Sequence, residues 1–294
     1  MLPDDSPPRN HAQHRAITFR LSTAPPFDGP GLFRFFADHA IAGVESASAQ
    51  SYSRAIRLET GEARFTVRLL GSAGVQCDAW LHSVSDRPQL EAAIARLFDL
   101  DADSGLIDAA LARDPALAPT VRGTPGVRLP GSLDAHETLF RTLLGQQVSV
   151  AAARTVLGRV CRELTDGSGL FPTAQQFALR GRQVLRGPMA RITSIVAVAE
   201  ALASGDLIVN DRMPLAELTS TLKSQRGIGP WTADYVAMRV LGSPDVPLAS
   251  DLIMVQSASA LGIASSARQL LAVGERWAPW RSYAGLHLWR AANR

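Results

Sequence analysis

Hydrophobic and polar positions follow two different periods along this chain. In the first hundred residues, three short segments alternate apolar and polar side chains, which is the period of a β-strand: 17–21, 55–58 and 63–70. Residues 31–41 and 89–98 instead carry apolar side chains at helical spacing. These patterns predict a small antiparallel sheet accompanied by helices.

After about Asp101 only the helical period remains. Glycine and proline separate most of the expected helices, which are 106–111, 133–144, 149–164, 173–179, 189–203, 214–224, 233–241, 252–261, 267–277 and 279–294. Residues 118–131 contain repeated proline and glycine and are interpreted as a connector. We therefore predict an α+β fold in three segments: a polar, proline-rich disordered tail at 1–15, a β-rich N-terminal domain at 16–104 and an all-α part at 105–294.

Composition excludes several classes of protein. The chain has 294 residues and a mass of 31.4 kDa, which predicts two domains, and 46% of its residues are hydrophobic, enough for a real core. We expect no membrane span, because no stretch approaches roughly 18 apolar residues, and no secretory signal, because the N-terminus lacks an apolar segment. Cys77 and Cys161 belong to no metal or disulfide motif, so we expect a cytoplasmic protein.

Charge is distributed unevenly between the two parts of the chain. Residues 1–120 carry 11 arginines and 15 acidic residues, a net charge of −4. Residues 121–294 carry 18 arginines, the single lysine Lys223 and 12 acidic residues, a net charge of +7. A basic excess in the helical part is typical of a surface that meets a polyanion, although a solvated arginine-rich surface gives the same count.

One tight turn carries the most specific sequence signal. The stretch Leu222–Ala237 reads LKSQRGIGPWTADYVA, in which one helix ends, Gly227-Ile228-Gly229 forms a hairpin and a new helix begins near Pro230. Both glycines tolerate a positive φ, and proline fits a first helical turn. The exposed N–H groups of such a helix N-terminus suit a DNA phosphate, whereas an ordinary helix–helix turn is the simpler interpretation.

Three further stretches are weaker signals when taken alone. Asp251 begins an apolar helix twenty residues after Trp231, where a helix-capping role is the simplest one. Gln146 and Gln147 interrupt two helical runs and place two amides at an exposed junction. Residues 277–289 hold three of the five tryptophans, and aromatic side chains at helical spacing usually belong to a core.

Together these stretches resemble one known family. LLGQQVSVAAAR, GIGPWTADYVAMR, the aspartate of LASDL and WAPWRSYAGLHLW are similar, in this order, to motifs of the helix-hairpin-helix DNA glycosylases, and within them to the AlkA-type 3-methyladenine DNA glycosylases. The resemblance extends over nearly the whole chain from about Ala16. It implies a helical glycosylase core of two subdomains, with the helix-hairpin-helix at about 214–241.

The resemblance implies a role for one carboxylate. Asp251 matches the catalytic aspartate of the family. Cleavage of an N-glycosidic bond builds positive charge on the sugar, which a carboxylate stabilises while it orients or deprotonates the attacking water. A base alkylated on a ring nitrogen is already cationic and leaves with little acid help, so one carboxylate suffices.

The family also has a pocket for a base that is flipped out of the duplex. The residues that match this pocket are Trp231, Tyr235, Trp289, Phe35 and Leu252, the last at a position where some relatives carry tyrosine. Aromatic faces attract a cationic base by about 0.5–2 kcal/mol. Gln147 matches the residue that wedges into the gap left in the duplex, where unstacking costs a few kcal/mol.

The hairpin matches the phosphate-contacting turn of the family through Gly227, Ile228, Gly229 and Thr232. Carbonyl groups of this turn hold a monovalent cation, Na⁺ or K⁺, in the family, and the matching residues are Lys223, Gln225 and Ile228. Here the pair Gln225-Arg226 replaces the usual apolar-Pro pair, so the cation is an optional structural ion. We expect no required cofactor.

Three functions stay open at this point. The resemblance favours a monofunctional glycosylase, acting as a monomer on damaged bases in double-stranded DNA, for which 3-methyladenine, 7-methylguanine, hypoxanthine and ethenoadenine are all candidate lesions. A bifunctional glycosylase/lyase needs a lysine amine where this chain has Trp231, and Lys223 lies outside that position. The third function is a non-catalytic helix-hairpin-helix protein that only binds damaged DNA.

Overall fold

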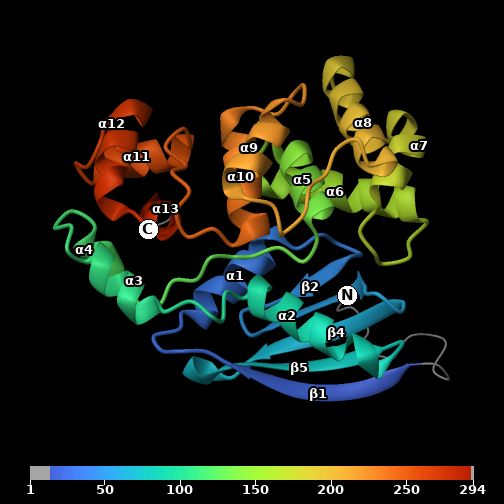
Figure 1. Cartoon of the computed structure of the whole chain (residues 1–294), viewed down its shortest axis with the longest axis horizontal. Helices are drawn as coiled ribbons and strands as arrows, with labels where there is room; N and C mark the ends of the chain where they lie inside the picture. Colours follow the sequence, from blue (N-terminus) through green and yellow to red (C-terminus); the bar gives the residue numbers. More distant parts are fainter. Residues whose placement is uncertain (1–13, 293–294) are drawn as a thin grey trace.

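A five-stranded antiparallel sheet forms the N-terminal part of the computed structural model, which describes residues 14–292 (Figure 1). Its spatial order is β1-β5-β4-β3-β2, with β1 at Arg15–Ser22, β2 at Glu45–Ala47, β3 at Ser51–Arg57, β4 at Glu62–Leu69 and β5 at Gly74–Leu81. The register places Phe19, Cys77, Val67 and Tyr52 side by side on adjacent strands, and all four are buried. This row forms the centre of the inner face of the sheet.

Two helices, α1 (Gly29–His39) and α2 (Arg87–Leu97), cover that inner face. Phe33 and Phe36 of α1 and Leu90 and Ile94 of α2 share one hydrophobic core with the strands. Asp28 caps α1 by accepting a hydrogen bond from the Gly31 N–H at 3.0 Å. The sheet therefore fixes α1, whose other side faces the helical part of the molecule.

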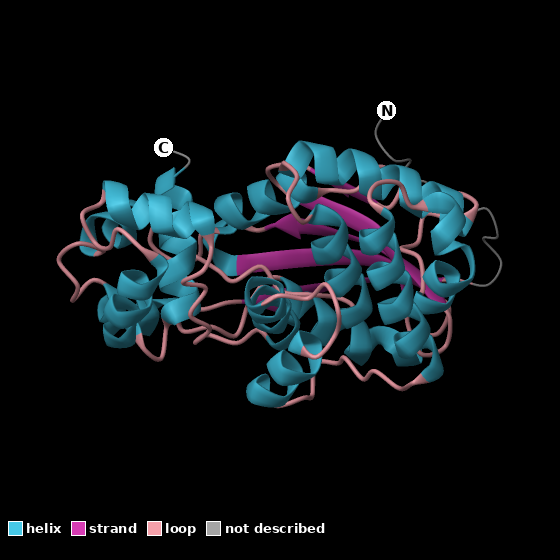
Figure 2. Ribbon diagram, turned by 90° about the horizontal axis from the view of Figure 1, so that it is seen from above, coloured by secondary structure: helices cyan, strands magenta, loops and turns pink. Residues whose placement is uncertain are grey.

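The remaining chain is helical and packs around two further cores. The helices are α3 (Ser104–Leu111), α4 (Ala118–Gly123), α5 (Ala135–Gly145), α6 (Val150–Thr165), α7 (Ala174–Val184), α8 (Met189–Ser204), α9 (Leu215–Lys223), α10 (Pro230–Leu241), α11 (Leu252–Ala260), α12 (Ala267–Gly274) and α13 (Arg281–Ala292). One core is formed mainly by the helices from α5 through α10. The other is formed mainly by α3 and α4 together with α11, α12 and α13. Figure 1 places α5 to α10 over the sheet and α11 to α13 to one side of it, above α3 and α4. Seen from above in Figure 2, the strands lie under one group of helices, and the other group lies beside them. The predicted α+β fold is confirmed.

Several predicted elements differ in detail. The strands β2 and β5 were missed, the latter because Cys77 and Ala79 are weakly apolar although they alternate correctly on the buried face. Residues 118–123 form α4 rather than part of a connector, because Pro119 stands in the first turn, where its missing N–H costs nothing. Strand β1 begins at Arg15, inside the predicted tail 1–15, and residues 1–13 lie outside the described residues.

The limits predicted for the domains, 16–104 and 105–294, stay a prediction. Within residues 14–292, none of the helices is both long enough and apolar enough to span a lipid bilayer.

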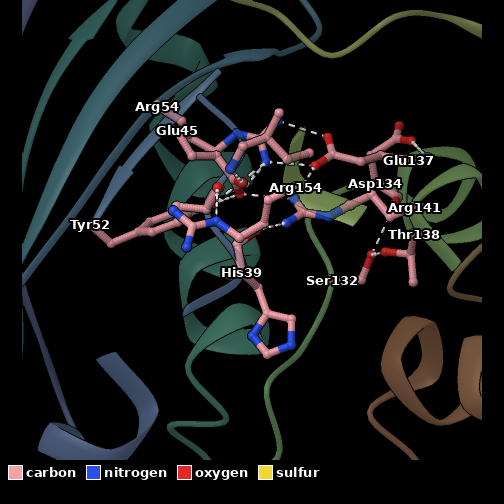
Figure 3. A network of polar contacts seen from close by, with 12 residues as sticks. His39, Glu45, Tyr52, Arg54, Ser132, Asp134, Glu137, Thr138, Arg141 and Arg154 are labelled. Carbon is pink, nitrogen blue, oxygen red and sulfur yellow. Dashed lines mark hydrogen bonds and ion pairs between the residues drawn. The ribbon is translucent and has the colours of Figure 1, made fainter. Parts of the chain in front are cut away.

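A buried ionic cluster joins the sheet to α5 (Figure 3). Arg54 of β3 donates to both carboxylate oxygens of Glu137 on α5, at 2.8 and 2.7 Å. Arg141, one turn further along α5, donates to Glu45 of β2 at 2.9 Å and to Glu137 at 3.0 Å. Tyr52 donates its hydroxyl to Glu45 at 2.6 Å. We name this set, Glu45, Tyr52, Arg54, Glu137 and Arg141, the interdomain cluster.

Burial and charge act in opposite directions within the interdomain cluster. Burial alone would raise the pKa of Glu45, but the guanidinium charges of Arg141 and Arg54 lower it to about 2. Arg141 also donates to the carbonyl of His39 at the end of α1, at 2.8 Å. The cluster thus fixes α1 relative to α5.

Candidate active site

The hairpin between α9 and α10 has the geometry that its sequence predicts in most respects. Gly227 has φ +89°, and an added Cβ would lie 3.1 Å from the Cβ of Ser194, so both the backbone and the available space favour glycine. Ile228 is buried in the helical core and anchors the turn. Gly229 has φ −85° and open space at its Cβ, so of the two glycines only Gly227 uses the tolerance for a positive φ.

Asp251 lies at the N-terminus of α11, where three N–H groups bind its carboxylate. Oδ1 accepts from the backbone N–H of Met254 at 2.9 Å and from the indole N–H of Trp289 at 3.0 Å. Oδ2 accepts from the indole N–H of Trp231 at 2.8 Å. Asp251 is therefore both a helix cap and the meeting point of two tryptophans from α10 and α13.

The predicted aromatic residues of the helical part surround this carboxylate. Trp231 and Tyr235 lie one helical turn apart on α10 and stack with centroids 5.2 Å apart and an interplanar angle of 11°. The ring of Trp289 meets Tyr235 edge-on, with centroids 6.2 Å apart. The structure thus brings together the carboxylate and three of the five predicted pocket residues.

Phe35 of α1 reaches the same group through an arginine that sequence reasoning missed. Arg239 lies one turn after Tyr235 on α10, with its guanidinium carbon 5.1 Å from the ring centroid of Phe35 and 5.6 Å from that of Tyr235. It donates to the Tyr235 hydroxyl at 2.8 Å and to the Gly131 carbonyl at 2.9 Å. The signal in the sequence was its i,i+4 spacing from Tyr235, on the same side of the helix.

Leu252 follows Asp251 and points outward. Its exposed fraction is 68%, and that of its neighbour Ile253 is 45%. Neither side chain contributes to a hydrophobic core among residues 14–292. The two therefore form a short apolar surface next to the carboxylate.

Gln147 occupies the junction between α5 and α6 in a left-handed conformation, with φ +61°. Its side chain is exposed, as are Val148 and Val150 beside it. A positive φ is uncommon for a residue with a side chain and here places an amide on an exposed turn. This geometry fits a side chain that projects toward a large partner.

Gln146 points in the opposite direction, into the hairpin. Its side-chain amide donates to the Thr232 hydroxyl at 2.9 Å and to the Gly227 carbonyl at 3.3 Å. Thr232 is buried, and its hydroxyl is held by this hydrogen bond. Sequence reasoning noted Gln146 as an exposed amide but missed its role in joining the end of α5 to the hairpin.

The carbonyl groups that match the family's cation site lie at the end of α9 and in the turn. Within residues 14–292, the carbonyls of Lys223 and Ile228 accept no backbone hydrogen bond, and the carbonyl of Gln225 accepts one from the N–H of Ile228 at 3.1 Å. Unused carbonyl oxygens are ligands that fit a hard monovalent cation. No group of three or more His, Cys, Asp or Glu residues in the described part of the chain has the arrangement of a metal site.

Comparison with known proteins agrees with this geometry. The family model of the AlkA N-terminal domain matches residues 18–134. DNA-3-methyladenine glycosylase 2 of Escherichia coli is 33% identical over 285 residues, which cover 92% of this chain and 96% of that protein. The chain belongs to the AlkA family of helix-hairpin-helix glycosylases.

Two other similar proteins differ from this chain in length or in sequence. A Mycobacterium tuberculosis protein named "Probable bifunctional transcriptional activator/DNA repair enzyme AlkA" is 36% identical over 93% of this chain, which spans only 56% of that protein. The solved structure of a 3-methyladenine DNA-glycosylase from Archaeoglobus fulgidus superposes with a TM-score of 0.80, covering 94% of this chain and 98% of that one at 18% identity. The latter shows a shared fold.

Proposed function

We propose that this AlkA-family chain is a monofunctional DNA glycosylase that releases alkylated bases from duplex DNA. The observation that carries the proposal is the Asp251 carboxylate held between the indole N–H groups of Trp231 and Trp289. The same two hydrogen bonds thereby connect the carboxylate to the aromatic side chains that would contact a base. The E. coli relative, whose name describes this activity, supports the proposal because it matches over nearly its whole length.

Asp251 would act on the sugar rather than on the base. When the N-glycosidic bond breaks, its electron pair moves to the base and positive charge develops at C1′. A carboxylate fixed by three N–H donors stabilises that charge without reorganising and accepts a proton from the water that attacks C1′. A cationic base leaves as a neutral molecule, so this step needs no general acid.

Duplex DNA would bind through the hairpin and the junction at Gln147. Backbone N–H groups at the N-terminus of α10 would contact a phosphate, as helix N-termini commonly do. Gln147 would fill the gap left by the flipped base, offsetting an unstacking cost of a few kcal/mol. The net charge of +7 in residues 121–294 supports a polyanionic partner.

The carbonyls of Lys223, Gln225 and Ile228 would hold a monovalent cation, which would add positive charge beside the bound phosphate. A monomer acting in the cytoplasm fits this proposal. Titration of DNA affinity with K⁺ at constant ionic strength tests the cation, since only a specific site responds to the identity of the ion.

A lyase reaction is the weaker alternative. It would need a lysine amine to form a Schiff base with the sugar. Lys223, the single lysine of the chain, instead forms an ion pair with Asp234 at 3.3 Å on the outside of α9 and α10. We expect the product to be an intact abasic site, and trapping of the chain on DNA by borohydride would contradict this.

Base release from methylated DNA, resolved by product, tests the proposal directly. Asp251→Asn should abolish most release while DNA affinity and melting temperature stay close to wild type, because the substitution removes charge without changing volume. Asp114→Asn is the matched control: Asp114 has the same exposed fraction of 8% as Asp251 and also accepts an indole N–H, from Trp277 at 2.7 Å, but it lies outside the candidate site. Near-normal release by Asp251→Asn would refute the catalytic role.

A further inference from the structure

Arg239 is a cation in the wall of the candidate site with no carboxylate beside it. Within residues 14–292 it forms no ion pair, and its guanidinium is bound by one carbonyl, one phenol oxygen and two aromatic rings. Its Nε is buried and has no hydrogen-bond partner in the same part of the chain. Arg239 therefore keeps its positive charge beside Tyr235 with no acidic partner within ion-pair distance in this part of the chain.

The contact with Tyr235 determines the direction of the tyrosine proton. Arg239 Nη1 donates to the hydroxyl oxygen at 2.8 Å, so the hydroxyl acts as acceptor on that side and its own hydrogen must point elsewhere. Among residues 14–292, the hydrogen bond found at this hydroxyl is the one that it accepts from Arg239. A neighbouring cation also polarises the O–H bond and strengthens it as a donor.

The other polar hydrogens of the aromatic wall are already used. The indole N–H groups of Trp231 and Trp289 both donate to Asp251. Of these three aromatic side chains, Tyr235 is therefore the one that keeps a donor for a bound base. Its ring stacks on Trp231, so the hydroxyl belongs to the same aromatic group as the two indoles that hold Asp251.

We propose that Arg239 is a positioning residue that turns the Tyr235 hydroxyl into a hydrogen-bond donor for neutral purine bases. The inference rests on the proposed glycosylase function. It adds that the release of neutral bases uses a hydrogen-bond donor in the site. When a neutral base leaves, the electron pair of the broken bond gives it negative charge, which a donor at its ring nitrogen or oxygen stabilises. The hydroxyl keeps its proton throughout, and the base takes up a proton from solvent after release.

A cationic base gains little from the same arrangement. It leaves as a neutral molecule, so no negative charge develops for the hydroxyl to stabilise. While bound, it also experiences the positive charge of Arg239 near Tyr235. The arrangement therefore favours neutral lesions over cationic ones, in opposition to the attraction of aromatic faces for cations.

The test compares two lesions in single-turnover excision: hypoxanthine, which is neutral, and 7-methylguanine, which is cationic. Tyr235→Phe and Arg239→Met should each slow hypoxanthine release by about tenfold, the loss expected for one hydrogen bond to a charge-polarised group. The loss for 7-methylguanine should be several-fold smaller. Arg239→Lys keeps the charge and one donor and should restore part of the hypoxanthine rate.

Two comparisons separate this role from a structural one. The double variant Arg239→Met/Tyr235→Phe should lose no more hypoxanthine activity than Tyr235→Phe alone, because Arg239 acts through the hydroxyl. Arg87→Met is the matched control: Arg87 also lies over an aromatic ring, 5.6 Å from the centroid of Phe19, but on α2 far from Asp251. It should leave both rates unchanged. Melting temperatures report any loss of folding.

The outcomes distinguish the inference from the function on which it rests. Equal losses for both lesions, additive losses in the double variant, or a wild type that releases 7-methylguanine but no hypoxanthine would overturn the role of Arg239 alone. A wild type that releases neither base would overturn the proposed function itself. A selective loss of hypoxanthine release that Arg239→Lys partly restores supports the inference.

Discussion

Replacing Arg54 by methionine should destabilise the protein far more than the loss of an ordinary surface ion pair. The interdomain cluster holds two arginines against two glutamates, and the side chains of Arg54 and Glu137 are only 4% and 7% exposed. Arg54→Met keeps much of the apolar volume but leaves two buried carboxylates to share Arg141. The destabilisation arises because a charge is left in a site that water cannot reach.

The expected loss is about 3–5 kcal/mol of the free energy of unfolding, the range measured when one partner of a buried pair is removed. The loss should shrink between pH 8 and pH 5, because burial raises the pKa of a carboxyl that has lost its cation and the group can then take up a proton. The double variant Arg54→Met/Glu137→Leu should recover most of the stability, since it restores the balance of one arginine and one glutamate.

Urea unfolding followed by both tryptophan fluorescence and circular dichroism provides the measurement, with coincident transitions required for a two-state analysis. Arg87→Met serves as control, because the Arg87–Glu91 pair has a similar distance of 2.8 Å but side chains 48% and 30% exposed, and should cost less than about 1 kcal/mol. A loss below about 1 kcal/mol for Arg54→Met, or additive losses in the double variant, would refute the reasoning.

Three further predictions concern other parts of the molecule. Burial lowers the pKa of His39 to about 4, so the folded state binds fewer protons than the unfolded state below pH 6.5. The free energy of unfolding, measured in urea and compared with that of a His39→Asn variant, should therefore fall as the pH drops from 6.5 to 4. Gly227→Ala should weaken binding to all DNA sequences more than Gly229→Ala does, because only Gly227 has a positive φ; equal effects in fluorescence anisotropy would argue against a turn held in that conformation. Gln147→Ala should slow excision of cationic and neutral lesions by a similar factor in single-turnover assays, since it raises the cost of flipping for either base, and a lesion-dependent effect would remove it from the wedge role.

Periodicity was sufficient to predict most of the fold, but weakly apolar strands escaped it. Most helices from α5 to α13 are bounded by glycine, proline or capping residues, so their positions follow from local sequence. Strand β5 pairs with β1 and β4, yet two of its four buried hydrophobic residues are the small Cys77 and Ala79, which weakens its local signal. Such a strand is determined by tertiary context.

The candidate site was predictable where it follows a motif and not where it depends on distant contacts. Asp251, Trp231 and Tyr235 lie in or near the hairpin stretch, and a family resemblance locates them. Arg239 and Gln146 act through contacts with Phe35 and Gly227, which are remote in sequence, and neither contact leaves a local pattern. Their roles required the folded arrangement.

The hydrogen bonds from Trp231 and Trp289 to Asp251 also constrain how this enzyme can diverge. Exchanging either tryptophan for a smaller side chain, as a change in lesion size would require, also removes an N–H donor from the carboxylate. In the proposed mechanism, a change at either position therefore alters substrate range and turnover together. Leu252 is 68% exposed and follows Asp251 without donating to its carboxylate, so under the same mechanism a substitution there would change the surface beside the carboxylate and leave its hydrogen bonds in place.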